Sequence, residues 1–264
     1  MVTGAFAGPT AGYYRRFRRD LPAAVLDQLT AAAGLTSADR VLDLGVGTGQ
    51  VAVPLAARVA TVIAVDREPD MLTQLRRRLA EETVTNVVCV LACDRDLPAV
   101  TAAVGPSTLA AVTVANALHD MDAAVVFAAC TRLLNPDGTV AVITHGRPLW
   151  LLDTPWARAV REYLQTWVGR LESTCGTDRD ALDERRRQLV TAGFTRVELL
   201  EHSYRAPVDA GLVLGHLASA MPADLIPPDR RHAFDDGLRA VLRPYEAAGD
   251  LVEDVPVTVL TGRR

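Results

Sequence analysis

The sequence predicts an α/β protein with a doubly wound, mostly parallel sheet of seven strands, and two observations lead to that prediction. Short apolar runs alternate with segments of helical periodicity between residues 40 and 144, an order of elements that builds a parallel sheet with helices on both faces. Residues 41–50 read as a buried strand, then three glycines at alternate positions, then the start of a helix. Glycines placed there let the backbone approach a ligand closely.

The first part of the chain is expected to alternate helices with strands. The expected helices cover residues 22–34, 50–58, a stretch from Pro69 onward, and 122–134. The expected strands cover residues 40–44, 61–65, 86–91, 109–114 and 139–144. Gly34 ends the first helix, and the turn residues 135–138 precede the fifth strand. The helix from Pro69 has an apolar core face, so the arginines at 76–78 are expected to point outward.

Beyond residue 145 the pattern changes. Helices are expected over residues 155–170 and 178–192, strands over 196–202 and 255–261, and a proline-interrupted helical stretch over 206–242. We therefore expect a single domain over residues 1–264. Within it, residues 1–34 form an N-terminal lid and helix, residues 35–145 the cofactor-binding core, and residues 205–245 a helical cap insertion.

Composition narrows the classes of function. The net charge of −4 and pI of about 5.8 leave no basic footprint for nucleic acid or an anionic membrane. No apolar run is long enough to span a bilayer, and the first ten residues do not resemble a signal peptide. The four cysteines form no zinc pattern, and we expect them to be reduced. The expected protein is cytoplasmic, a monomer or homodimer, and holds no metal.

The spacing of the glycines separates two kinds of nucleotide site. A dinucleotide fingerprint requires glycine at the first, third and sixth positions, but Gln50 occupies the sixth position counted from Gly45. The stretch Asp43-x-Gly45-x-Gly47-x-Gly49 instead resembles the first motif of the class I S-adenosylmethionine (SAM) methyltransferases. That resemblance implies a seven-stranded Rossmann-like fold with an antiparallel last strand, SAM as the cofactor, and contacts from these four residues to it.

Two acidic positions extend this resemblance. Asp66 ends the second strand about 20 residues after Gly45, where a carboxylate accepts two hydrogen bonds from the ribose hydroxyls; the alternative is a cap of the next helix. Arg67 is expected along the adenine. The segment from Asp94 to Pro98 resembles the third motif of the family, which implies that Asp94 and Arg95 contact the cofactor. An Asx turn is the alternative for Asp94.

The loop after the fourth strand is expected to face the ligand, because ligands bind at the carboxyl ends of parallel strands. It reads Asn116-Ala117-Leu118-His119-Asp120. Small-molecule members of the resembled family often carry Leu-His here followed by an aromatic residue, whereas this chain has Asp120. Asn116 is expected to contact the cofactor, and His119 to orient or deprotonate the acceptor. A hydrogen-bonded structural histidine is the alternative.

Several further residues are candidates from their position alone. His145 and Trp150 follow the fifth strand and are expected to line the acceptor pocket, the alternative being a capped loop with a packed tryptophan. In the basic, aromatic segment 13–19, Tyr14 is expected at the cofactor and Tyr13 at the acceptor, the alternative being a solvated helical turn. His216, with Met221 and Leu225, is a candidate in the cap.

These residues predict methyl transfer to oxygen or nitrogen of a small organic acceptor. The signature loops of DNA amino methyltransferases, cytosine C5 enzymes and arginine methyltransferases are missing. A composition rich in Arg and Ala suggests a GC-rich bacterial genome, in which such enzymes often modify natural products. Two alternatives keep the fold and SAM: a cyclisation or isomerisation without methyl transfer, and a non-catalytic SAM-binding protein. A nicotinamide oxidoreductase is disfavoured by the glycine spacing.

Overall fold

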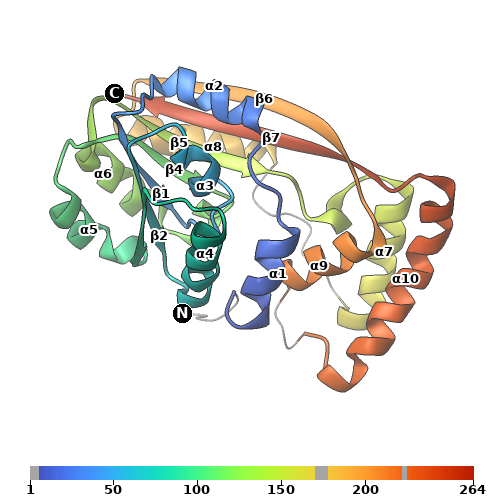
Figure 1. The fold of residues 1–264 in the computed structure, drawn as a ribbon. Helices are drawn as coiled ribbons and strands as arrows, with labels where there is room; N and C mark the ends of the chain where they lie inside the picture. Colours follow the sequence, from blue (N-terminus) through green and yellow to red (C-terminus); the bar gives the residue numbers. More distant parts are fainter. Residues whose placement is uncertain (1–5, 170–177, 222–224) are drawn as a thin grey trace. The chain divides into compact units, whose positions relative to one another are not determined.

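The computed structural model describes residues 6–169, 178–221 and 225–264 (Figure 1). The chain divides into two compact units. The sheet unit comprises Arg19–His145, Gly176–His202 and Val257–Arg264. The helical unit comprises Met1–Arg18, Gly146–Cys175 and Ser203–Pro256.

One seven-stranded sheet has the strand order β3-β2-β1-β4-β5-β7-β6. The strands are β1 Arg40–Leu44, β2 Thr61–Asp66, β3 Val87–Leu91, β4 Leu109–Ala115, β5 Leu134–His145, β6 Arg196–Pro207 and β7 Val252–Arg263. The pairs among β1 to β5 are parallel, and β7 runs antiparallel to β5. This confirms the predicted mostly parallel sheet with an antiparallel last strand. The last strand of the chain lies inside the sheet, between β5 and β6.

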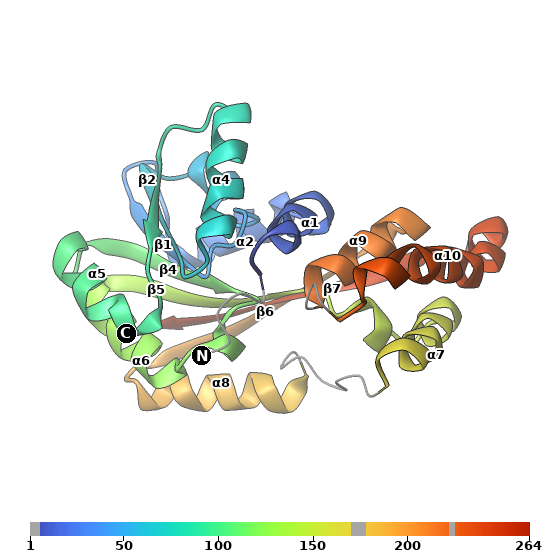
Figure 2. The ribbon, with the colours of Figure 1, turned by 90° about the horizontal axis from the view of Figure 1, so that it is seen from below.

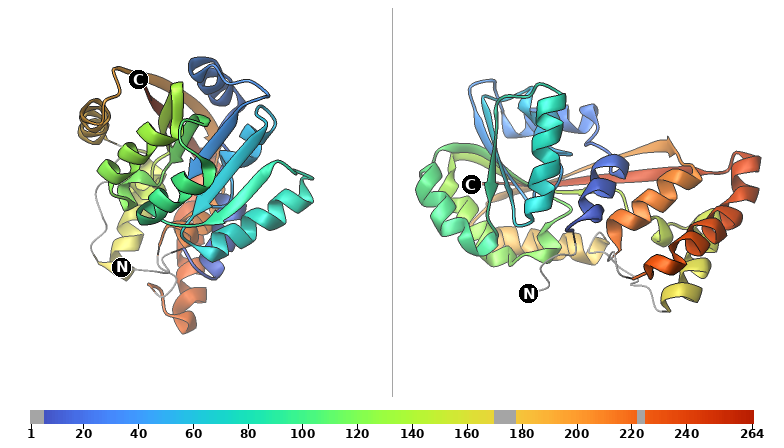
Figure 3. Two further views of the ribbon diagram at one scale, coloured as in Figure 1. Left: turned by 90° about the vertical axis from the view of Figure 1, so that its left-hand side faces the viewer. Right: turned by 60° about the horizontal axis from the view of Figure 1, so that its bottom comes forward.

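Helices cover both faces of this sheet, as the alternating pattern predicted. The helices of the sheet unit are α2 Ala23–Ala33, α3 Ala52–Ala56, α4 Pro69–Glu81, α5 Leu97–Val104, α6 Ala123–Leu133 and α8 Arg179–Thr191. Figure 2 shows α2 and α4 on one side of the strands and α5, α6 and α8 on the other. The left view of Figure 3 shows the same separation, with teal α4 and green α5 on opposite sides.

The core of the sheet unit lies between the central strands and these helices. Leu42 and Val112 of the neighbouring strands β1 and β4 are fully or almost fully buried, as is Phe127 of α6. Burying one such side chain contributes about 1.5–3 kcal/mol. The two central strands therefore form a rigid base, and the loops that hold the candidate site residues leave from its carboxyl edge.

Three local expectations need correction. Helix α3 covers only Ala52–Ala56 rather than residues 50–58, because Gly49, with φ of 92°, holds the preceding turn in a conformation that a helix cannot contain. Residues 135–138, expected as a turn, lie within β5, where the pairing with β4 shifts in register. Arg78, expected to point outward, is only 9% exposed.

The helical unit is built from pairs of packed helices. They are α1 Pro9–Phe17, α7 Pro155–Val168, α9 Ala210–Ala220 and α10 Arg231–Ala248, with a short 3-10 helix, η3, at Leu149–Leu151. Helix α1 packs on α9, and α7 packs on α10 (Figure 1). Trp156 and Phe234 are buried in this second core, and the Tyr163 hydroxyl donates to the carbonyl of Phe234 at 2.9 Å.

Helix α1 is fitted closely to α9. A Cβ on Gly215 of α9 would overlap the ring of Phe17, so the absence of a side chain there lets the two helices approach. One turn further along, Arg18 Nε donates to Ser219 Oγ at 2.9 Å. The expected cap, residues 205–245, falls within this unit, which also contains α1 and α7. The expected core, residues 35–145, falls within the sheet unit.

Candidate cofactor and acceptor site

The glycine loop after β1 is held at both ends by close contacts. Gly45, Gly47 and Gly49 all have positive φ, between 56° and 92°, a region that other residues rarely adopt. The backbone N–H of Gly45 donates to the carbonyl of Val65 at the end of β2, at 2.8 Å. A Cβ on Gly45 would lie 2.5 Å from that of Ala117 in the loop after β4. Both conformation and space therefore require glycine here.

Asp66, the last residue of β2, joins the glycine loop to the second strand. Its Oδ2 accepts from the N–H of Gly47 at 2.7 Å, and its Oδ1 accepts from the N–H of Glu68 at 2.9 Å. Burial of this carboxyl, which is 8% exposed, raises its pKa above the usual value. Each carboxylate oxygen keeps a further lone pair. Asp66 can therefore accept two more hydrogen bonds beside a loop that it already positions.

Asp43 supports the same loop from inside the sheet. Its Oδ1 accepts from the hydroxyl of Thr113 on β4 at 2.7 Å, and its carboxyl group also accepts from the backbone of Ala52 at the start of α3. Burial is the main cause that raises the pKa of Asp43 to about 7. The side chain is 2% exposed, so Asp43 acts on the cofactor site through the backbone of the loop and α3. Its partner Thr113 was not found from the sequence.

Arg78 of α4 is a second residue that sequence reasoning missed. Its guanidinium pairs with both carboxylate oxygens of Asp20, at 2.8 and 2.6 Å, and with Glu82 at 2.7 Å. It also donates to the carbonyl of Gly49 at 3.3 Å. Burial lowers the pKa of Arg78, but the hydrogen bonds and charges of these two carboxylates together outweigh it and hold the pKa above its usual value. Arg78 therefore fixes the end of the glycine loop.

The candidates at the ends of β2 and β3 have partners on neighbouring loops. Arg67, exposed, lies 3.5 Å from Asp120 and 3.8 Å from Glu68 in ion pairs. Asp94 Oδ2 accepts from the N–H of Asp122 at 2.9 Å, which ties the loop after β3 to the start of α6. Arg95 is exposed in the same 3-10 turn.

The loop after β4 holds two candidates in different surroundings. Asn116 has a positive φ of 47°, and its side chain brackets the end of β5. Its Nδ2 donates to the carbonyl of His145, and its Oδ1 accepts from the N–H of His145, both at 3.0 Å. His119 is exposed, and in the described part of the chain its ring has no hydrogen-bond partner. The structure thus gives His119 none of the internal bonds that a structural histidine would make.

The remaining candidates lie in the helical unit. Tyr14 is half-buried on α1, with the Arg18 guanidinium 5.1 Å from its ring centroid. Tyr13, one residue earlier, is 39% exposed and lines a pocket. Trp150 on η3 and His216 on α9 are both buried, at 9% and 7% exposure.

The structure therefore assigns the candidates to two groups. The sheet unit brings together, at the carboxyl ends of its parallel strands, Asp43, Gly45, Gly47, Gly49, Asp66, Arg67, Asp94, Arg95, Asn116, His119 and His145. The helical unit contains Tyr13, Tyr14, Trp150 and His216. Among the residues that the structure describes, no group of three metal-ligating side chains occurs, and no helix is long and apolar enough to cross a membrane.

The sheet unit fits a nucleoside cofactor with a ribose. The carboxylate of Asp66 is positioned by two backbone N–H groups and has a free lone pair on each oxygen, which matches a pair of adjacent hydroxyls. At Gly45 and Gly49 the space for a side chain is filled by neighbouring side chains, so these glycines keep the loop closely packed, with Gly47 bonded to Asp66. These residues fit the cofactor that the sequence predicts.

Comparison with known proteins agrees with this geometry. Residues 41–138 match a family described as a methyltransferase domain. An uncharacterised methyltransferase of Mycobacterium tuberculosis is 31% identical over 178 residues, which cover 67% of this chain and 62% of the relative. A methyltransferase of Aspergillus candidus is 36% identical over 106 residues, or 40% of this chain and 32% of that protein. The chain thus spans about three fifths of the length of the mycobacterial relative.

Solved structures share the fold. The YcgJ protein of Bacillus subtilis superposes with a TM-score of 0.56 at 17% identity, covering 91% of this chain and 99% of that one. The phosphoethanolamine N-methyltransferase 2 of Haemonchus contortus, solved with phosphomonomethylethanolamine and S-adenosylhomocysteine, gives a TM-score of 0.54 at 16% identity. It covers 96% of this chain and 56% of that protein. The family match and the mycobacterial relative confirm the predicted resemblance to SAM-dependent methyltransferases, and the solved structures confirm the fold.

Proposed function

We propose, from the premise that this chain carries a class I SAM-dependent methyltransferase domain, that the protein transfers a methyl group to oxygen or nitrogen of a small organic acceptor. One observation carries the proposal. The glycine loop is fixed at the carboxyl edge of β1 with the Asp66 carboxylate bonded to it, and that carboxylate keeps a lone pair on each oxygen for a ligand.

SAM, when bound, supplies a methyl group on a positively charged sulfonium, already activated for direct displacement. The protein then has to bind and align, and positioning supplies most of the acceleration in such a reaction. In this proposal the Asp66 carboxylate accepts hydrogen bonds from the ribose hydroxyls. The loop of Gly45, Gly47 and Gly49 lies against the cofactor. Asp43 and Arg78 hold this loop in place. Arg67, Asp94, Arg95, Asn116 and Tyr14 complete the cofactor set.

His119 is proposed as the residue that handles the acceptor proton. It is exposed, follows β4, and has no internal hydrogen-bond partner among the described residues. A neutral imidazole can accept a proton from a hydroxyl or an ammonium near neutral pH. Tyr13, His145, Trp150 and His216 are proposed to line the acceptor site. We also propose that residues 1–34 act as a lid, residues 35–145 as the cofactor-binding core, and residues 205–245 as a cap.

The acceptor is proposed to be a small natural-product-like molecule, modified in the cytoplasm of a bacterium by a monomer or homodimer. The composition, rich in Arg and Ala, supports the bacterial part of this proposal. The acidic net charge of −4 supports an acceptor other than nucleic acid.

Turnover tests the proposal directly. The purified chain is incubated with SAM and a panel of small phenols, carboxylic acids and amines, and S-adenosylhomocysteine is measured by mass spectrometry. We expect product with at least one acceptor class, and none with the Asp66→Ala variant at low SAM concentration. If the wild-type chain binds S-adenosylhomocysteine but forms none from SAM with any acceptor, a cyclising enzyme or a SAM-binding regulator replaces the methyltransferase.

A further inference from the structure

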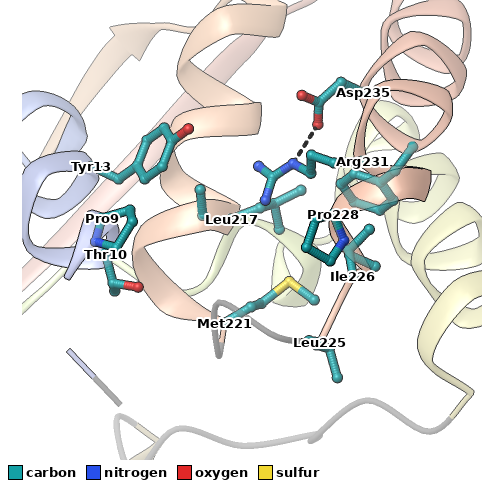
Figure 4. Close-up of a pocket in the computed structure, with 12 residues that line it drawn as sticks. Pro9, Thr10, Tyr13, Leu217, Met221, Leu225, Ile226, Pro228, Arg231 and Asp235 are labelled. Carbon is teal, nitrogen blue, oxygen red and sulfur yellow. Dashed lines mark hydrogen bonds and ion pairs between the residues drawn. The ribbon is translucent and has the colours of Figure 1, made fainter. Parts of the chain in front are cut away.

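A pocket of about 330 Å³ lies within the helical unit, between α1, α9 and the start of α10 (Figure 4). Its volume is at the lower end of the roughly 300–1,000 Å³ typical of small-molecule sites. Most of its wall is apolar and comes from Leu217 of α9, from Met221 directly after this helix, and from Ile226 and Phe234. A ligand of this pocket would therefore be small and mainly apolar.

Polar groups without partners interrupt that apolar wall on two sides. Thr10 and Tyr13 come from α1. Thr10 is only 2% exposed, and in the described part of the chain neither its hydroxyl nor that of Tyr13 has a hydrogen-bond partner. A hydroxyl without a partner can donate to or accept from a ligand or water. The pocket thus offers two hydroxyl groups to an occupant.

Arg231 supplies the charged part of the opposite wall. Its Nε donates to Asp235 Oδ1 at 3.0 Å, the bond drawn as a dashed line in Figure 4. No other hydrogen bond of this guanidinium is found among the described residues. In Figure 4 its terminal nitrogens point away from Asp235, into the space between Leu217 and Tyr13. The planar edge formed by these two nitrogens matches the two oxygens of a carboxylate, or a single carbonyl oxygen.

We propose that this pocket binds a small, largely apolar molecule that places a carboxylate or conjugated carbonyl oxygen on the Nη edge of Arg231. This proposal rests on the pocket alone and is independent of the proposed function. Asp235 already accepts the Nε–H of Arg231, so the ligand is left with the Nη edge. The apolar body packs on Leu217 and Met221, and Thr10 and Tyr13 bond its other polar atoms.

Three probes on one carbon skeleton test the chemistry: cinnamate, cinnamamide and cinnamylamine, titrated into the full chain by calorimetry. We expect cinnamate and cinnamamide to bind, and cinnamylamine to bind at least ~10-fold more weakly than cinnamate, because an ammonium has no acceptor for Arg231. Equal affinity for the amine and the acid, or binding by none of the three at millimolar concentration, would overturn the proposal.

Variants on α10 then locate the site. Arg231→Gln should weaken cinnamate binding at least ~10-fold, since a bidentate charge-assisted contact is lost. Arg231→Lys should recover only part of it. Arg239→Gln, at an exposed position of the same helix, is the matched control and should bind as the wild type does. Unchanged cinnamate affinity in a folded Arg231→Gln variant would place the ligand elsewhere.

Measuring the affinity for S-adenosylhomocysteine shows whether a negative result refutes this proposal or the proposed function. It should be the same in the wild type and in the Arg231→Gln variant, because the cofactor candidates of the sheet unit are unchanged. Tryptophan fluorescence checks that the variant is folded, since Trp167 packs edge-on against Phe234 at 5.3 Å between ring centroids. Loss of cofactor binding in the wild type, with cinnamate binding intact, would instead refute the methyltransferase proposal and leave the pocket.

Discussion

At the scale of single residues, two buried aspartates near the glycine loop differ in whether they can still accept hydrogen bonds from a ligand. Asp43 is 2% exposed and bonds Thr113 and the backbone of Ala52, so its interactions are internal. Asp66 bonds two backbone N–H groups and retains lone pairs beside the loop. From this difference we infer that Asp66 contacts the cofactor and that Asp43 positions the loop.

Asp66→Ala should lower the affinity for S-adenosylhomocysteine at least ~10-fold. The substitution removes two hydrogen bonds from a charged acceptor, each contributing about 1.5–3 kcal/mol in gross terms. It also leaves the N–H of Gly47 without its acceptor. Calorimetry measures the change, with Asp137→Ala at an exposed position as the control. A folded Asp66→Ala protein that binds the ligand as tightly as the wild type would remove Asp66 from the site.

Asp43 should make stability depend on pH. Its pKa rises from 3.8 to about 7 on folding, so between pH 4 and 7 the folded chain binds more protons than the unfolded chain. The free energy of unfolding therefore falls as pH rises through this window, by ~4 kcal/mol in all from this group, and levels off above it. Urea unfolding at several pH values should show this slope in the wild type and a shallower one in Asp43→Asn, where the raised pKa of Asp66 still contributes. Parallel curves for the two proteins would contradict the assignment.

At the scale of elements, the loop after β4 contains one residue fixed by hydrogen bonds and one exposed residue without them. Asn116 fixes the loop by its paired bonds to the backbone of His145. Three residues later, His119 is exposed and makes no hydrogen bond within the described chain. A rigid loop that presents an imidazole without internal hydrogen bonds is the arrangement needed to take a proton from an acceptor or to orient it.

His119→Ala should leave cofactor affinity nearly unchanged and lower turnover by about 10²–10⁴-fold, the usual contribution of a positioned base. His119→Asn should recover part of the rate if the ring only orients the acceptor, and little if it accepts a proton. Steady-state rates and S-adenosylhomocysteine affinity are measured for both variants. Wild-type turnover in His119→Ala would move attention to Tyr14 and His145.

The contact of α1 with α9 should control the pocket of the helical unit. Gly215→Ala places a methyl group where the Phe17 ring lies, so α1 must shift, and with it Thr10 and Tyr13 of the pocket wall. We expect cinnamate to bind at least several-fold more weakly, and S-adenosylhomocysteine affinity to change less, because Tyr14 is the one proposed cofactor residue on α1. Gly12→Ala on α1, where a Cβ meets no atom within 4 Å, is the control. Equal cinnamate affinity in the wild type and in Gly215→Ala would show that α1 does not shape the pocket.

The local sequence pattern predicts most of the helices and strands. It does not predict the distant residues that hold the site residues in place. The apolar runs that predicted β1 and β2 are buried on both faces, so their signal is strong. The apolar core face of the helix from Pro69 predicts that Arg78 points outward, but its partner Asp20 is 58 residues away. The Thr113 partner of Asp43 is 70 residues away. Contacts at such separations follow from the packed fold and leave no trace in a short window of sequence.

Two strands link the two units at the scale of the whole molecule. Strands β6 and β7 each begin in one unit and end in the other. All three tryptophans, Trp150, Trp156 and Trp167, belong to the helical unit, whereas the cofactor candidates other than Tyr14 belong to the sheet unit. Tryptophan fluorescence therefore reports the unit that does not contain the glycine loop.

S-adenosylhomocysteine at 100 times its dissociation constant should stabilise the protein by about 2.7 kcal/mol, or about 5–10 °C in Tm for a chain of this size. Because β6 and β7 are continuous through both units, we expect tryptophan fluorescence and far-UV circular dichroism to shift together. Thermal scans with both signals, with and without ligand, measure this. A fluorescence transition that occurs first and ignores the ligand would show that the units unfold separately.

The place of β7 also governs how the chain can fold while a ribosome is making it. β7 is made after both β5 and β6, yet it lies between them. Roughly 100 residues separate the end of β5 from the start of β7, so at about 5–20 residues per second the edge of β5 stays open for about 5–20 s. Once β6 has been made, it too lacks its neighbour until β7 is in place. A nascent chain therefore exposes unpaired edges of β5 and β6, which are sites for mispairing with other chains, until β7 inserts between them.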